Sequence, residues 1–379
     1  AIVGSIRRGK EMVSDIDILL ASNDNAALYD FIKDFPAIRQ IEQVDHDLIR
    51  GELAPGIEFE VIIVAPSDYF HSLAWTTGSK EHRERLFAGI DRQEFKDLQN
   101  ETEVYTRLGL DYIAPELREN RGEIEAAGAG NLPKLINFPD IRGDLHVHSN
   151  WSDGVERIQD LAAAARSLDY EYIAITDHSK SLTISGGLSD ERLQAQGKVI
   201  DALNAEATGG FRILKGTEVD ILKTGELDFP DPVLKELDIV VASVHSNFKL
   251  DADQQTERIV EAAKNEHVDI IGHLTGRLLS RRSGYEIDVD KIIDTCARCH
   301  TGLEINAHPD RLDIDEHIAR KAKEYGVKVA INSDAHHRNE LKLMAYGVTT
   351  ARRGWLEPGD VLNTLSLEKL LKALGKAPD

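Results

Sequence analysis

Cysteine is scarce in this sequence of 379 residues, which contains only Cys296 and Cys299, the second followed by His300. Cys-x-x-Cys-His is the pattern of c-type haem attachment. Residues 289–300, however, have the apolar spacing of a helix, and no signal segment directs the chain out of the cytoplasm. We therefore expect no haem and, in a reducing cytoplasm, no disulfide.

Long apolar runs are also missing. No stretch approaches the roughly 18 residues that a membrane span requires, so we expect no contact with a membrane. Residues 1–8 contain neither an initiator Met nor the apolar core of a signal peptide, and they read as part of a strand. We expect a fragment of a longer chain. With 41% hydrophobic and 29% charged residues, the composition is that of a soluble globular protein, which we expect in the cytoplasm.

Positive charge is in deficit, because 45 Lys and Arg stand against 66 Asp and Glu, a net charge of −21. The deficit is spread evenly, with −11 over residues 1–140 and −10 over residues 141–379. This argues against a broad basic surface for nucleic acid. It leaves a nucleic-acid substrate open, because bound divalent cations reverse the charge of a carboxylate-rich cleft.

Changes of pattern along the chain divide it into regions. The first reads as strands around one helix, with strands at 16–20 and 58–64 and the helix at 25–34. A charged, helix-rich region follows, and then a linker that contains Gly and Pro. We expect a first region at residues 1–66, a helix-rich region at 67–126, a linker at 127–140 and a last region at 141–379.

The last region repeats one unit seven times. Apolar strands are expected near 143–147, 171–176, 212–217, 238–244, 268–272, 302–306 and 327–332, with amphipathic helices between most of them, such as 156–168, 253–267 and 314–325. A polar residue ends or follows each strand: His146, His178, Glu218, His245, His273, Asn306 and Asp334. Repeated strand-helix units form either an open sheet or a barrel. Because only a barrel would bring all these residues to one mouth, we expect a distorted (β/α)7 barrel.

Metal-ligand residue types dominate these strand ends. His146 and His148 stand two apart on one strand and therefore share a face. The full candidate set is His146, His148, Asp153, His178, Glu218, His245, His273, Asp334 and His336. Nine ligands exceed the needs of one ion, so we expect two or three. Mixed imidazole and carboxylate ligands favour Mn, with Zn or Fe as alternatives, and the absence of thiolates argues against a structural zinc site. Such clusters serve phosphate-ester hydrolysis.

These motifs resemble those of the polymerase and histidinol phosphatase (PHP) domain. The segments DLHVHS, SDG, ITDHS, GTEVD, SVH, GHLTGR and NSDAH occur in the order found in that family, over about residues 141–350. The resemblance implies a distorted seven-stranded barrel and a trinuclear site with the nine ligands above. All nine positions carry residues of the family type, which implies an active site.

A second group of polar residues lies near the N-terminus. A Gly-Ser-x-Arg-Arg-Gly segment, with Ser5 and Arg8, precedes Asp15 and Asp17, two carboxylates on one face of a strand. Together with Thr77-Gly78-Ser79-Lys80, this resembles the palm of X-family DNA polymerases. The whole chain resembles the C-terminal two-thirds of a bacterial X-family polymerase with a fused PHP exonuclease. The resemblance implies Mg or Mn on Asp15 and Asp17, a deoxynucleoside triphosphate at Ser5 and Arg8, and a small α/β thumb after a nucleotidyltransferase-like palm remnant.

The palm departs from the family at two places. The third catalytic carboxylate is the longer Glu60, in a strand that has lost the family arginine, and Thr76 stands where the family has an aromatic residue. The upstream domains are also missing, so we expect no polymerase activity in this fragment.

Our hypothesis is a DNA-repair enzyme whose barrel acts as a metal-dependent 3′–5′ exonuclease. Arg277, Arg281 and Arg282 follow His273 and are expected to line a DNA track. The first alternative is a phosphomonoesterase of the histidinol-phosphatase type. The second gives the N-terminal part no catalytic role and makes it a DNA-binding scaffold for the barrel.

Overall fold

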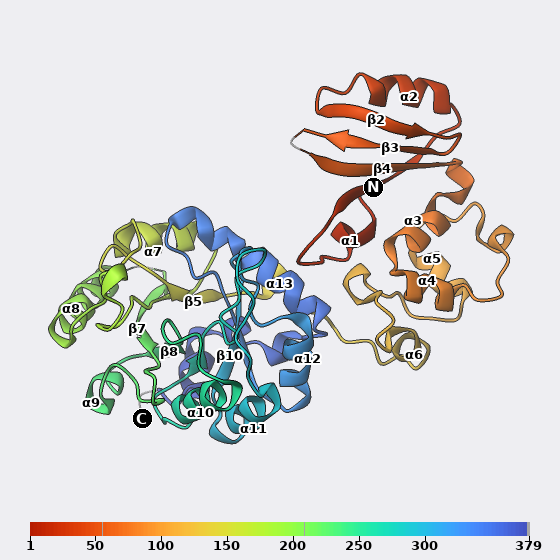
Figure 1. Cartoon of the computed structure of the whole chain (residues 1–379). Coiled ribbons are helices and arrows are strands. Elements are labelled where there is room, and N and C mark those ends of the chain that lie inside the picture. The colour runs from red at the N-terminus through yellow and green to blue at the C-terminus, as the bar shows by residue number, and fades with distance from the viewer. Residues whose placement is uncertain (55, 208, 377–379) are drawn as a thin grey trace. The chain divides into compact units, whose positions relative to one another are not determined.

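The computed structural model describes residues 1–54, 56–207 and 209–376. The chain forms two compact units, Ala1–Pro133 and Lys134–Asp379, and each is described by itself (Figure 1). Within the described residues, no helix combines the length and the apolar character that crossing a membrane requires.

The first unit begins with a four-stranded sheet in the order β1-β4-β3-β2. Strand β1 (Asp15–Ala21) pairs in parallel with β4 (Ile57–Val64), and β3 (Leu48–Leu53) pairs antiparallel with β4 and β2 (Ile38–Val44). Helix α2 (Asn25–Lys33) packs Ile32 against the sheet core of Ile49, Phe59, Val61 and Ile63. The strands expected at 16–20 and 58–64 and the helix at 25–34 are confirmed.

Short helices make up the rest of this unit: α1 (Gly4–Arg7), α3 (Tyr69–Thr77), α4 (Lys80–Leu86), α5 (Thr102–Arg107), α6 (Glu123–Gly128) and the 3-10 helices η1 (Pro66–Asp68), η2 (Arg92–Phe95) and η3 (Pro115–Leu117). A buried carboxylate links them. Glu101 accepts hydrogen bonds from Arg7 at 2.7 and 2.8 Å and from the fully buried Arg118 at 2.7 Å. These bonds tie α1 to the helices that follow the sheet. The finer division into palm, thumb and linker stays a prediction.

The second unit is built on seven parallel strands in the order β11-β10-β9-β8-β7-β6-β5. Their bounds are β5 Gly143–Val147, β6 Tyr172–Ile175, β7 Arg212–Asp220, β8 Ile239–Ser243, β9 Ile270–Ile271, β10 Gly302–Asn306 and β11 Val329–Asn332. The sheet nearly closes, because Val147 forms a parallel bridge with Ala335, and the backbone N–H of His148 donates to the Ala335 carbonyl at 2.8 Å. The expected distorted seven-stranded barrel is confirmed.

Helices cover this barrel (Figure 1). They are α7 (Ile158–Ser167), α8 (Asp190–Glu206), α9 (Asp231–Leu234), α10 (Ala252–Ala263), α11 (Val289–Cys299), α12 (Glu316–Glu324), α13 (Met344–Arg353) and α14 (Leu367–Ala373), with η4 (Phe138–Asp140), η5 (Thr183–Ser185), η6 (Arg338–Leu343), η7 (Pro358–Asp360) and η8 (Leu362–Thr364). Asp251, Asp288 and Asp315 accept hydrogen bonds from the first turns of α10, α11 and α12, which fixes where these helices begin. Because the strands run in parallel, their carboxyl ends all lie at one end of the barrel, its mouth.

Candidate metal centre

The strand ends bring all nine candidate ligands together. Parallel strands of one barrel present their carboxyl ends at the same mouth, and the candidate ligands lie near the end of a strand or in the loop that follows it. His146 belongs to β5 and Glu218 to β7. The others follow in the loops: His148 and Asp153 after β5, His178 after β6, His245 after β8, His273 after β9, and Asp334 and His336 after β11.

The ligand atoms form three overlapping groups, in each of which they lie within 4.8 Å of one another. The groups are His148, Asp153, His178 and His336; His146, His148 and Asp334; and His178, Glu218 and His245. Glu218 is the centre, because its oxygens lie 2.8 Å from His178 Nδ1, 3.2 Å from His245 Nε2 and 2.8 Å from His273 Nε2. The geometry suits two or three clustered ions, and that these residues bind metal stays a prediction.

Buried nitrogens at the centre test whether cations fit. His146 Nε2 and both ring nitrogens of His148 have no hydrogen-bond partner among the described residues, although both side chains are fully buried. His148 Nε2 nevertheless lies 3.1 Å from Asp334 Oδ1, without hydrogen-bond geometry. Orphaned buried nitrogens are costly in a dry interior. A cation between each nitrogen and its neighbouring carboxylate would satisfy both groups, so the ligands present fit divalent ions.

A second layer of carboxylates, which the sequence analysis missed, orients the imidazoles. Glu304 of β10 accepts from His146 Nδ1 at 2.7 Å and from the backbone N–H of His273 at 2.7 Å. Asp220 accepts from His245 Nδ1 at 2.6 Å. Such partners fix the ring so that its other nitrogen faces the metal. The available signal was a charged residue inside an otherwise apolar strand, as in Gly302-Leu-Glu-Ile-Asn306.

Electrostatics divides the histidines into two kinds. Burial and the neighbouring His178 and His336 lower the pKa of His148 to about 3, so this ring is neutral. Burial also opposes charge on His178 and His245, but the Glu218 carboxylate outweighs it and raises their pKa values to about 10 and about 9. Metal ligation needs neutral imidazoles, so a cation that binds here would displace protons from His178 and His245.

The three arginines expected to line a DNA track all make contacts within the protein. Arg277 donates to the backbone carbonyls of Arg311 and Leu312. Arg282 donates to the Gly276 carbonyl at 2.7 and 3.0 Å and lies over the Phe248 ring. The exposed Arg281 pairs with Asp310 at 3.1 Å. Their contact with DNA stays a prediction.

Arg311, which the sequence analysis did not single out, approaches the metal ligands themselves. Its Nε lies 3.6 Å from Asp334 Oδ2, and 21% of its side chain is exposed. Asp334 is thus a buried ligand candidate with a guanidinium group beside the oxygen that also accepts from the Asn306 amide at 2.9 Å. That position suits a non-bridging oxygen of a phosphate held at the ions.

The N-terminal candidates meet only in part. Ser5, Arg8, Asp15 and Asp17 line one cavity of about 360 Å³, together with Gly78, Ser79 and Lys80. Burial and the carboxylates of Asp15 and Glu60 raise the pKa of Asp17. Arg8 is buried and donates to the Thr77 carbonyl at 2.8 Å.

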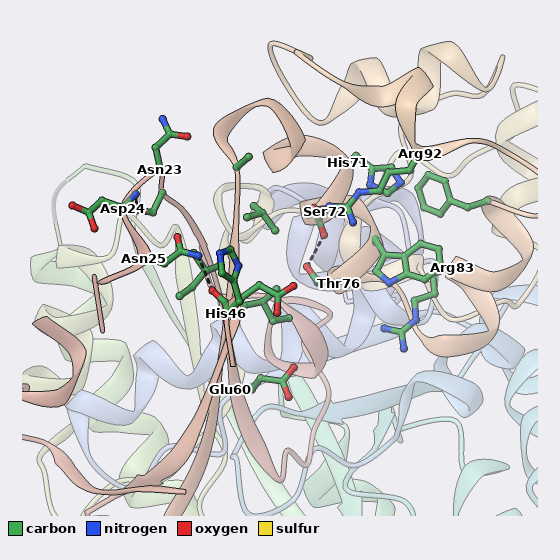
Figure 2. Close-up of a pocket in the computed structure, with 18 of the residues that line it drawn as sticks. Asn23, Asp24, Asn25, His46, Glu60, His71, Ser72, Thr76, Arg83 and Arg92 are labelled. Atoms are coloured by element: carbon green, nitrogen blue, oxygen red, sulfur yellow. Dashed lines mark hydrogen bonds between the residues drawn. The ribbon is translucent and has the colours of Figure 1, made fainter. Parts of the chain in front are cut away.

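Glu60 stands beside Asp17 in the strand register but is held by another group. Its Oε2 lies 2.5 Å from Arg50 Nε on the neighbouring strand β3. Glu60 does not line the cavity of Asp15 and Asp17 but a larger one (Figure 2). Of the three carboxylates expected to act together, Asp15 and Asp17 therefore face one cavity and Glu60 faces another.

Comparison with known proteins identifies this arrangement. Residues 144–308 match the family model described as "PHP domain". A "probable phosphatase" of Thermoanaerobacter sp. (strain X514) is 32% identical over 232 residues, which cover 58% of this chain and 89% of that protein. The chain belongs to the PHP family. The barrel, here called the PHP unit, is the part that carries this match.

The likeness to an X-family polymerase with a PHP domain is confirmed as well. "DNA polymerase/3'-5' exonuclease PolX" of Bacillus subtilis (strain 168) is 41% identical over 384 residues, covering 96% of this chain and both of its units. The chain spans 66% of the length of that relative. Among solved structures, a histidinol phosphate phosphatase (HISK) from Lactococcus lactis is similar, at 18% identity and a TM-score of 0.44, over 56% of this chain and 93% of that one.

Proposed function

We propose that the PHP unit is a divalent-metal-dependent phosphoesterase that removes nucleotides from the 3′ ends of DNA in repair. The observation that carries the proposal is that nine ligand-type side chains, Glu218 among them, gather at the barrel mouth. No single strand supplies them, so the arrangement depends on the whole barrel. We place the protein in the cytoplasm, where such a repair enzyme meets its DNA.

Within the site, each residue has a task that its contacts support. Two or three ions, Mn first and Zn or Fe as alternatives, would be held by the nine ligands, and they would supply Lewis-acid activation at phosphorus. Glu218 and Asp334 bring negative charge to the centre, and Glu304 holds the His146 ring in place. Arg311 is placed to hold a phosphate oxygen beside Asp334.

A DNA substrate is favoured over a small phosphomonoester by the extent of the likeness. The relative that matches both units is named a DNA polymerase and 3′–5′ exonuclease, whereas the relatives that match only the PHP unit are named probable phosphatases. A chain with both units therefore resembles the DNA-processing protein more. The phosphomonoesterase remains the second candidate because the same ligand set is compatible with it.

We also propose that this chain carries out no templated synthesis. The Glu60 carboxylate is paired with Arg50, and Thr76 directs its hydroxyl to the Ser72 carbonyl at 2.7 Å instead of presenting an aromatic face. Should the palm act, Mg or Mn at Asp15 and Asp17 and a deoxynucleoside triphosphate would be its ligands. The palm would otherwise serve to bind DNA.

The test combines metal analysis with hydrolysis. The purified chain is stripped with a chelator, reloaded with Mn²⁺, and incubated with a 5′-labelled single strand and, separately, with p-nitrophenyl phosphate. Stepwise shortening from the 3′ end supports the exonuclease. Rapid hydrolysis of p-nitrophenyl phosphate with an intact oligonucleotide would favour the phosphomonoesterase instead.

A further inference from the structure

One buried carboxylate at the mouth of the PHP unit is not among the candidate ligands. Asp177 directly precedes His178 after β6, and its side chain is fully buried. The three groups of ligand atoms found among the described residues do not include it. Burial of a charged group is costly unless hydrogen bonds compensate for it, so the partners of Asp177 indicate what this carboxylate does.

The partners of Asp177 lie mainly in the loop of residues 149–153 after β5, here called the serine loop. Its Oδ1 accepts from the backbone N–H groups of Ser149 and Ser152, at 2.8 and 3.2 Å, and from the Ser152 hydroxyl. Its Oδ2 accepts from the Ser149 hydroxyl at 2.5 Å and from the Gln196 amide of α8. Two serines of one loop thus supply most of the hydrogen bonds, and a covering helix fixes the carboxylate from its other side.

The serine loop carries the candidate ligand Asp153. It turns back so closely that a Cβ at Gly154 would lie 2.4 Å from the His148 carbonyl oxygen. In this conformation the Asp153 carboxylate faces three imidazoles. Its oxygens lie 3.6 Å from His148 Nδ1, 3.2 Å from His178 Nε2 and 3.4 Å from His336 Nε2. Because the Asp153 side chain is 27% exposed, its position depends on the conformation of the loop more than on core packing.

The neighbouring ligands are held in another way. In the described part of the chain, the other two groups of candidate ligands contain no residue of the serine loop. The backbone N–H of His148 donates to the Ala335 carbonyl at 2.8 Å. The His178 carbonyl accepts from the Leu188 N–H at 2.8 Å, and His178 forms a parallel bridge with Glu218. The hydrogen bonds of the Asp177 side chain therefore bear on Asp153 more directly than on these ligands.

We propose that Asp177 is a positioning residue for one ion of the metal centre. It holds the serine loop so that Asp153 can bind this ion together with the three imidazoles that it faces. This role rests on the metal-dependent function proposed above and deepens it, because one ion then depends on a residue that is not a ligand. Binding groups must be held within about 0.5 Å of their working positions. Asp177→Asn would turn an amide toward the donors of the serines, leave buried N–H groups unpaired and release the loop.

The test counts bound ions. The full chain is stripped with a chelator and titrated with Mn²⁺, and calorimetry and metal analysis after gel filtration give the number and affinity of the bound ions. Asp177→Asn should bind one ion fewer than the wild type at micromolar Mn²⁺, because the affinity of the Asp153 site falls about 10- to 100-fold. Millimolar Mn²⁺ should restore the missing ion, a rescue that general damage to the barrel would not show.

Two further variants separate this role from damage to the fold. Ser152→Ala removes one hydroxyl that donates to Asp177 but keeps the buried carboxylate, so it should lower the affinity for the same ion by a smaller factor. Asp201→Asn changes a 56% exposed carboxylate on α8, the helix that carries Gln196, and should bind Mn²⁺ like the wild type. Circular dichroism and thermal unfolding in EDTA check the fold of each variant.

A folded Asp177→Asn variant that binds as many ions as the wild type, with equal affinity, would overturn the proposal. Loss of all ions together would overturn it as well, because the role assigned to Asp177 concerns one of them. If Asp177→Asn does not fold, Ser152→Ala decides, and an Mn²⁺ affinity equal to that of the wild type refutes the positioning role. A wild-type chain that binds no divalent ion contradicts the proposed function and the role of Asp177 together, whereas a wild type that binds ions just as its variants do contradicts the role of Asp177 alone.

Discussion

Glu304→Gln tests the layer of carboxylates behind the candidate ligands. The side chain is fully buried, and its two oxygens accept from His146 Nδ1, the His273 backbone N–H and the Asn332 amide. Glutamine has the same shape, but one of its ends is an amide donor. Whichever way it turns, an N–H group meets another N–H group at 2.7 to 2.9 Å.

The expected loss follows from what the His146 ring does. A ring without its carboxylate partner is a weaker and less well oriented ligand, and such changes cost about 10- to 100-fold in metal affinity or activity. This corresponds to about 1.4 to 2.7 kcal/mol. The loss should appear mainly as a higher Mn²⁺ concentration for half-maximal hydrolysis, since all nine proposed ligands remain.

The assay is hydrolysis of a labelled oligonucleotide over a Mn²⁺ titration, with Glu206→Gln as a matched control on the exposed end of α8. Circular dichroism and thermal unfolding verify that the variant folds. An unchanged Mn²⁺ requirement in a folded Glu304→Gln variant would refute the claim that His146 is a ligand oriented by Glu304.

Further predictions concern the ligands, the arginine at the site, the palm and acid stability. His148→Ala should reduce DNA hydrolysis by orders of magnitude even with excess Mn²⁺, and near-normal turnover would remove it from the ligand set. Arg311→Gln should slow hydrolysis by 10-fold or more with normal metal content; equal rates would exclude contact with the substrate. Primer extension with all four nucleotides and Mn²⁺ should give no product, and extension that Asp17→Ala abolishes would show an active palm. Burial opposes ionisation of Glu101, but hydrogen bonds from two arginines lower its pKa to about 2 from 4.5, so its stabilisation of about 3 kcal/mol at neutral pH should disappear as the pH falls from 4.5 to 2. Urea unfolding should therefore show that Glu101→Gln destabilises the first unit much less at pH 2.5 than at pH 7, whereas exposed Glu84→Gln changes stability at neither pH; equal losses at both pH values would contradict the ionic role.

The sequence predicted the barrel well because its signals are local. All seven strands and the three helices named in advance occur, with boundaries that differ by a few residues. Strand β9 is shorter than expected, with two residues where five were expected, since the chain leaves the sheet at Gly272 toward His273. The β2–β3 hairpin was missed because β2 is a polar strand with five of its seven residues exposed. It lacks the alternation of apolar and polar residues that indicates a half-buried strand.

The site was predictable where ligand types recur at strand ends, but not where distant side chains meet. Glu304 and His146 lie 158 residues apart, and no spacing links them. Similarly, the arginines after His273 were identified by charge alone, whereas the contacts of Arg277 depend on where the carbonyls of residues 311 and 312 lie in the fold. Local periodicity thus predicts which residues reach the mouth, and only the tertiary structure tells which of them face the metal centre.

The proposal to be tested is that Glu218 and the eight other candidate ligands at the barrel mouth hold the divalent ions on which DNA hydrolysis depends. Its most direct test is to strip the chain with a chelator, restore Mn²⁺, and measure bound metal and 3′-end hydrolysis together, for wild type and Glu218→Gln. We expect two or three ions per wild-type chain, with hydrolysis that returns only on reloading, and loss of both the bound metal and the hydrolysis in the variant. A wild-type chain that binds no divalent ion at micromolar concentration, or hydrolysis that persists in the stripped protein, would contradict it.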